Sequence, residues 1–230
     1  MRGQTLETLL TRLREETGLS TNLRHNYQAR DGQVALLRRM QEWIYDAADW
    51  EHMKRKWRIA VEAGLSQYAI PDQMNWDRVI KAVRVDEGGE TPLVPEIGTF
   101  EVNFPVREDG VEGRSDKTQS YEISNGVITI WPTPRTTSGF IDIYAFKRLD
   151  PLLSDNSRAE MDDQLIYLFA AAETLTAAGD KSAQAKLEAA NTRMAQLTKQ
   201  VERIKVFTAG NGLPQPSYGN RLNSGRRPWR

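Results

Sequence analysis

The spacing of hydrophobic residues changes twice along the chain and divides it into three parts. In the first part, apolar residues recur at intervals of three and four, which is typical of amphipathic helices. Thr5 is the expected N-cap of one helix, which ends at Gly18, and Asp31 is the expected N-cap of a second. The second helix is predicted to run to Trp50 and needs a partner, since its apolar residues cover one face only. These apolar positions are Leu6, Leu9, Leu10 and Leu13 in the first helix, and Leu36, Leu37, Met40, Trp43, Ile44 and Ala47 in the second.

From about residue 54 the period is two, which is typical of strands. Asn125-Gly126 separates two such strands and predicts a hairpin, because a type I′ turn needs positive φ at both central residues. Residues 140–146 are apolar on both faces apart from Asp142, so they are expected to form a central strand. Strands joined by hairpins predict a small antiparallel sheet or sandwich. The other strand candidates are residues 57–61, 68–71, 79–85, 100–104, 121–123 and 127–131.

After Arg158 the helical period returns and predicts a helical hairpin that Gly179-Asp180 divides. Helices therefore precede and follow the strands. We predict an α+β fold in which both chain ends build a four-helix bundle, an antiparallel β domain is inserted, and an extended C-terminal arm follows. The expected boundaries are 1–52 for the N-terminal helices, 53–150 for the β domain, 151–207 for the C-terminal hairpin and 208–230 for the arm.

Charge is unevenly placed along the 230 residues, although the formal net charge is zero. The last 23 residues hold four arginines and no acid, so the rest of the chain has 27 basic and 31 acidic residues. Bulk attraction to nucleic acid is therefore not expected of the folded body. The absence of cysteine excludes disulfides and thiolate chemistry. No apolar run approaches the roughly 20 residues of a membrane span, and no signal peptide is evident, so synthesis in the cytoplasm is expected.

Candidate catalytic groups are few. His25 and His52 stand apart from any acidic cluster with ligand spacing, and both are expected at the surface. Asp162 and Asp163 fall in the first turn of a predicted helix, where the helix dipole favours negative charge. No nucleophile, phosphate-loop or metal motif occurs. We therefore expect no cofactor, no metal and no enzyme activity.

Tryptophan occurs in two settings. Trp43, Trp50 and Trp57 lie near the predicted join of helices and strands, where packing in a core is expected. Trp229 lies instead between Arg227 and Arg230 in the unpatterned basic segment. Such an end is either disordered or an anchor that becomes ordered on binding a larger body, and the two interpretations are compatible.

The order of these elements resembles the head–tail adaptor (connector) proteins of tailed bacteriophages, the group related to tail tubular protein A of short-tailed phages. The resemblance covers most of residues 1–207. It rests on two N-terminal helices with a Trp-rich end and on short motifs: Tyr68-Ala69-Ile70-Pro71, residues 127–134, residues 140–146, and Leu152-Leu153 before a helix pair split at Gly179-Asp180.

The resemblance implies a structural protein of the virion, placed at the head–tail junction. It implies a ring of twelve copies beneath the portal protein, helices around the channel through which viral DNA passes without sequence-specific binding, and a platform for the tail nozzle or a tail-completion protein. It also implies that the C-terminal arm docks on the portal. The positions assigned to that docking are Tyr218, Arg221, Arg226, Arg227, Trp229 and Arg230.

Other functions stay open at this point. The basic tail is also compatible with a nucleic-acid-binding module, which would show tight, salt-sensitive DNA binding that is lost on truncation of the tail. Another neck or tail-completion protein of similar build would show the same order of elements. A tail-associated hydrolase would need a cleft with paired carboxylates, which sequence spacing does not exclude.

Overall fold

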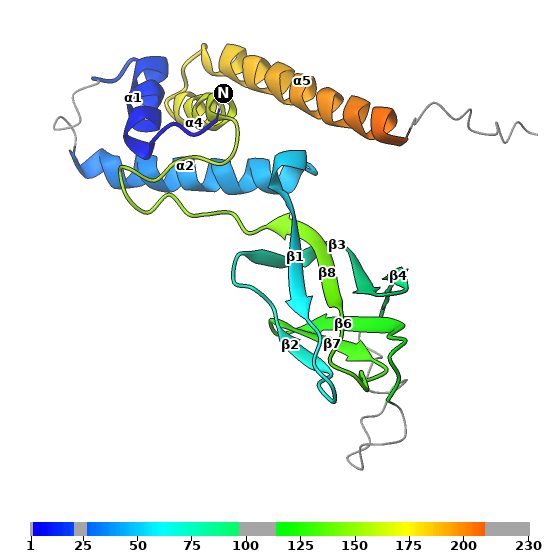
Figure 1. Cartoon of the computed structure of the whole chain (residues 1–230). Helices are drawn as coiled ribbons and strands as arrows, with labels where there is room; N and C mark the ends of the chain where they lie inside the picture. Colours follow the sequence, from blue (N-terminus) through cyan, green and yellow to red (C-terminus); the bar gives the residue numbers. More distant parts are fainter. Residues whose placement is uncertain (1, 21–26, 97–113, 210–230) are drawn as a thin grey trace, which may run out of the picture. The chain divides into compact units, whose positions relative to one another are not determined.

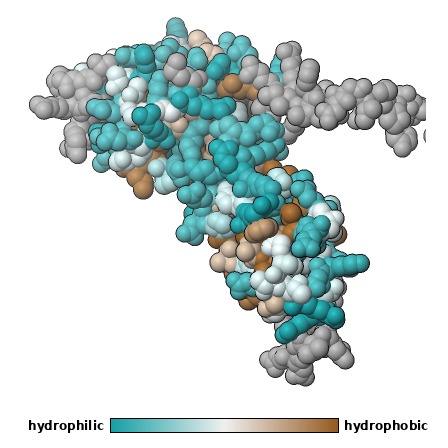
Figure 2. All heavy atoms as spheres, viewed as in Figure 1, coloured by the Kyte–Doolittle hydropathy of each residue, from teal (hydrophilic) through white to brown (hydrophobic). Residues whose placement is uncertain are grey.

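The computed structural model describes residues 2–20, 27–96 and 114–209 (Figure 1). The chain forms two compact units. One unit combines Met1–Asp49 with Ser154–Arg230, and the other is Trp50–Leu153. The first contains the helices and the second the sheets, which confirms the predicted α+β class. In the view of Figure 2, hydrophilic residues cover most of the helical unit, whereas hydrophobic residues are interspersed over the β unit.

The helical unit is arranged around α4, which contacts each of the other three helices. Nine of the 15 residues of α4 are buried, including the alanines at positions 170–172. Small side chains on several sides let other helices approach this one closely, which explains its central place. The helices are α1 (Leu6–Thr17), α2 (Tyr27–Ala47), α4 (Asp163–Ala177) and α5 (Ala183–Ala209).

The ends of α1 agree with the sequence prediction. The side chain of Thr5 accepts a hydrogen bond from the backbone N–H of Thr8, and Gly18 ends the helix with φ 70°. All four predicted leucines of α1 are buried. Gly179, also at φ 70°, separates α4 from α5, which contact each other as a hairpin.

The limits predicted for the second helix are wrong. This helix begins at Tyr27 and so includes Asp31, and it ends at Ala47 rather than Trp50. Gln28, Ala29 and Arg30 favour helix, and their propensity outweighs the preference of Asp31 for a capping position. Trp50 is buried in the β unit, where it precedes the short 3-10 helix Glu51–Met53.

The β unit consists of two four-stranded sheets that share one core. Residues such as Ile143 and Ala82 in the first sheet and Ile128 and Ile130 in the second meet there. The first sheet has the order β1 (Lys54–Ala60), β8 (Phe140–Lys147), β3 (Met74–Asp86), β4 (Gly89–Pro92). The second has the order β2 (Gln67–Ala69), β7 (Val127–Trp131), β6 (Ser120–Ser124), β5 (Val94–Pro95).

Strand pairing is antiparallel as predicted, except that β5 pairs with β6 in parallel over two residues. Asn125 and Gly126 both have positive φ, 49° and 76°, and close the β6–β7 hairpin. Strand β8 lies between β1 and β3, which confirms it as a central strand. The predicted strand at residues 100–104 lies outside the described residues.

The residue that precedes β8 must be a glycine. Gly139 has φ 71°, and a Cβ at this position would lie 2.2 Å from the backbone oxygen of Val85. Any side chain would therefore push β8 away from β3, where Val85 pairs with Phe140. Gly139 is thus required by the packing of the central strand.

Candidate functional site

The six residues assigned to portal docking, Tyr218, Arg221, Arg226, Arg227, Trp229 and Arg230, lie outside the described residues. Their role stays a prediction. His25 also lies outside, and His52 lies in the 3-10 helix with its ring 6.0 Å from that of Trp50. The candidate site described below is therefore drawn from the described residues.

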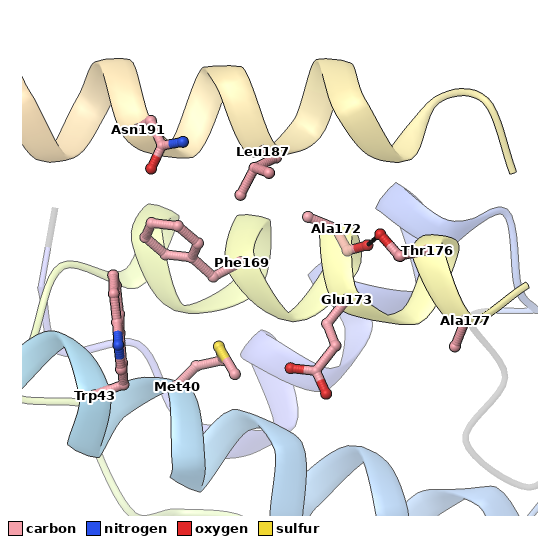
Figure 3. A pocket seen from close by; sticks show the side chains of 9 residues that line it. All are labelled: Met40, Trp43, Phe169, Ala172, Glu173, Thr176, Ala177, Leu187 and Asn191. Carbon is pink, nitrogen blue, oxygen red and sulfur yellow. Dashed lines mark hydrogen bonds between the residues drawn. The ribbon is translucent and has the colours of Figure 1, made fainter. Parts of the chain in front are cut away.

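An apolar groove crosses the helical unit between α2, α4 and α5 (Figure 3). Its volume is about 550 Å³. A large, mainly apolar hollow on a folded surface is typical of a binding site. Its lining is Met40 and Trp43 from α2, Phe169, Ala172, Glu173, Thr176 and Ala177 from α4, and Leu187 and Asn191 from α5.

Trp43 is the largest side chain of the groove and is 50% exposed, so the prediction that it packs in a core is wrong. One side of its ring meets Phe169 edge-on, with the ring centroids 4.9 Å apart. Leu187 across the groove is 38% exposed. Exposing an indole and a leucine on opposite sides of one groove costs free energy in water, and covering them with a partner would recover it.

The sequence of α2 contains a signal for this groove. The apolar stripe of α2 is wide, and its members divide into two sets in the structure. Leu37 and Ile44 are buried, whereas Met40 and Trp43 border the groove. A stripe wider than one neighbouring helix can cover indicates a second contact surface.

Charged residues bound the groove on one side. Arg39 of α2 forms an ion pair with Glu173 of α4, and both side chains are about half exposed. Beyond Glu173 a second hollow of about 500 Å³ continues between the same two helices, past Gly32 and Leu36. An exposed pair of this kind adds little stability but limits which partners fit the rim.

The start of α4 holds the helices in register. Asp162 accepts a hydrogen bond from the backbone N–H of Leu165 and pairs with Arg193 of α5 at 2.9 Å. Burial is the largest influence and would raise the pKa of Asp162, but the hydrogen bond from Arg193 and the nearby positive charges together outweigh it, and the pKa is lowered. The pKa of the neighbouring Asp163 is raised by burial. As predicted, Asp162 and Asp163 lie at a helix start; their contacts are structural.

The residues that line the groove include one carboxylate, Glu173, and no histidine. In the parts of the chain that the structure describes, no cluster of three or more His, Asp or Glu side chains is placed to hold a metal ion. None of the helices there is long and apolar enough to cross a bilayer.

Comparison with known proteins identifies the family. No curated protein matches the chain. Residues 4–212, which include every described helix and strand, match the family of the SU10 adaptor protein. This agrees with the resemblance to phage adaptors, whereas a specific relationship to tail tubular protein A is not established. The chain belongs to the SU10 adaptor protein family, a family of structural bacteriophage proteins.

Proposed function

We propose that this protein forms a ring-shaped head–tail adaptor that docks on the portal through its C-terminal arm. The ring extends the DNA channel and offers a platform to the tail nozzle or a tail-completion protein. Membership of the adaptor family over nearly the whole chain is the observation that carries the proposal. A ring of twelve copies at the head–tail junction is the form that the resemblance implies.

The helical unit is proposed as the ring-building body, with both chain ends contributing to one bundle. Two features support contact between copies. The groove exposes Trp43 and Leu187 to solvent, and burying them against a neighbouring copy would be favourable. Helix α5 also reaches past α4: Arg193 already lies level with Asp162 at the start of α4, and the helix continues to Ala209, about 24 Å further.

The overhanging end of α5 is the occupant that we propose for the groove of a neighbouring copy. Leu197, Val201 and Ile204 continue the apolar spacing of α5 in this part of the sequence. The partner α4 does not extend alongside it. An apolar groove on one copy and an apolar helix end on the next give a head-to-tail contact, and such contacts generate rings when the rotation closes.

Portal docking is proposed for Tyr218, Arg221, Arg226, Arg227, Trp229 and Arg230. Trp and Arg are the residues most often found as energetic anchors of interfaces, and this segment combines both with no acid.

The test is binding of the purified protein to its portal, measured by sedimentation and by negative-stain imaging of the complex. Deletion of residues 213–230 should abolish binding, and Trp229→Ala should weaken it at least tenfold, because interface tryptophans are typical hot spots. Trp76→Ala is a matched control, since Trp76 is an exposed tryptophan of the β unit. Normal portal binding by the deletion variant would overturn the docking proposal.

A further inference from the structure

The outer face of the first sheet carries a row of aromatic side chains on its central strand. In β8, Ile141 and Ile143 point into the core, so the alternate residues Phe140, Tyr144 and Phe146 lie on the opposite face. Asp142 lies in the same row. This face is formed by β1, β8 and β3.

Cations from the two neighbouring strands flank this row. Tyr144 pairs in register with Lys56 of β1 and Lys81 of β3, whose Nζ atoms lie 5.5 and 4.6 Å from its ring centroid. Phe146 has Lys54 at 5.8 Å and Arg78 at 4.1 Å. These distances are those of cation–π contacts, which hold the charges over the strand.

The fifth cation, Arg58, lies 4.8 Å from the ring centroid of Phe140 and is also held by a carboxylate. Its guanidinium donates two hydrogen bonds of 2.7 and 2.8 Å to Asp142, which is completely buried. Lys56 reaches the same carboxylate at 2.6 Å. Asp142 therefore holds Lys56 and Arg58, which are two residues apart on the same face of β1, but its single negative charge neutralises only one of them.

The face keeps an excess of positive charge. Lys54 is paired with Glu51 at 2.6 Å, whereas Lys56 and Arg58 share the single carboxylate of Asp142, and Lys81 adds a further charge beside Tyr144. Glu90 of β4 also acts on Arg58 electrostatically. Packing of Lys and Arg stems on aromatic rings explains part of this arrangement. It does not explain why five cations gather on one face of a chain whose body is acidic overall.

We propose that this face binds the phosphate backbone of DNA without regard to sequence. The two rows of cations are about 10 Å apart, twice the strand spacing, and cations within a row are about 7 Å apart. Duplex DNA presents one negative charge per roughly 1.7 Å of its axis, a density that ordinary acidic protein segments do not sustain. Cations already fixed by rings and by Asp142 lose little freedom on binding.

The inference rests on the proposed function only for the source of the polyanion, which is the viral DNA that the adaptor surrounds. The rings are covered by cations, so contact is ionic rather than by base stacking, and binding is expected to be weak and salt-sensitive. A weak, sequence-independent contact holds DNA in place and still lets it move.

The test is fluorescence anisotropy of the full chain with a labelled duplex of arbitrary sequence between 50 and 200 mM salt. The four arginines of the arm are first changed to Gln, so that the arm does not contribute. Lys56→Gln/Lys81→Gln removes the two charges beside Tyr144 and leaves the Arg58–Asp142 pair in place. The slope of log K against log salt should fall by about two, one for each lost phosphate contact.

Arg55→Gln/Lys117→Gln is the matched control, because it removes two exposed charges of the β unit that lie outside this face. It should leave the slope unchanged. Lys81→Gln alone, which breaks no bond to Asp142, should lower the slope by about one, and unchanged thermal unfolding confirms that the variants fold. The proposal is overturned if the unmodified face binds no duplex at 50 mM salt, if both double variants behave alike, or if polyglutamate competes as well as DNA does.

Portal binding by chains with the native arm, with and without Lys56→Gln/Lys81→Gln, reports separately on the proposed function. For Lys56→Gln/Lys81→Gln the expected result is the reduced salt slope of DNA binding with the substituted arm, and normal portal binding with the native arm. If the unsubstituted chain fails to bind its portal yet still binds DNA through this face, the adaptor proposal fails while the DNA-binding inference stands.

Discussion

At the scale of single residues, Asp142 is a buried carboxylate that joins β8 to β1 through its bonds to Arg58 and Lys56. The sequence marks it as the one acid in an otherwise apolar strand, which is a correct description of β8. Its partners Arg58 and Lys56 are more than 80 positions away and meet it only through the β1–β8 register. Neither hydrophobic period nor composition specifies that register, so the buried ion cluster could not be foreseen.

Asp142→Asn should lower the free energy of unfolding at pH 7 by about 1–3 kcal/mol, because it weakens buried hydrogen bonds. The hydrogen bonds from Arg58 lower the pKa of Asp142 in the folded protein. The stabilisation by this carboxylate is therefore present above its unfolded pKa of about 3.9 and is lost as the pH falls through the lower folded value. Urea unfolding at pH 7 and pH 3 checks this, with exposed Asp72→Asn as the control. An equal loss at both pH values would contradict the assignment.

Gly139→Ala should destabilise the β unit by more than about 2 kcal/mol, because a side chain would meet both an unfavourable backbone angle and the oxygen of Val85. Gly32→Ala makes the same chemical change within α2, where nothing lies within 4 Å of the added carbon. The free energy of unfolding of that variant should rise by about 0.5–1 kcal/mol, because alanine makes the unfolded chain less flexible and favours helix. Thermal unfolding of both variants distinguishes the two effects.

At the scale of elements, local chemistry predicted most of what the structure shows. The cap at Thr5, the helix end at Gly18 and the hairpin at Asn125-Gly126 each depend on neighbouring residues only. The sequence could not show that β5 pairs in parallel or that α2 borders a groove, because both depend on partners distant in sequence. The wrong N-cap at Asp31 is a case of helix propensity overriding a local signal.

Trp43→Ser should reduce self-association of the protein at least tenfold, because it removes the largest apolar surface of the groove. Stability of the isolated chain should change little, since half of the side chain is already exposed. Sedimentation at several protein concentrations, alone and with the portal, measures the effect. Trp76→Ser is the matched control, with 44% of its side chain exposed. Equal association by the two variants would show that the groove is not an interface between copies.

At the scale of the whole molecule, the β unit has a core of its own, with Ile128, Ile130, Ile141 and Ile143 completely buried. We expect a fragment of residues 50–153 to fold alone and to unfold cooperatively on heating. Circular dichroism and amide-proton NMR dispersion check this. Gly139→Ala in the fragment should lower its midpoint as in the full chain, and a fragment without cooperative unfolding would show that the helical unit is required.

The pairing of Lys54 with Phe146 has a consequence for the order of folding. Lys54 and Phe146 lie near the two ends of the β unit, so folding of the unit brings the chain to within about 5 Å of itself at this pair, as a short turn would. While the unit is unfolded, the same connection is a loop of about a hundred residues, and closing it costs entropy. Early folding of the β unit would therefore speed the docking of α4 against α1 and α2.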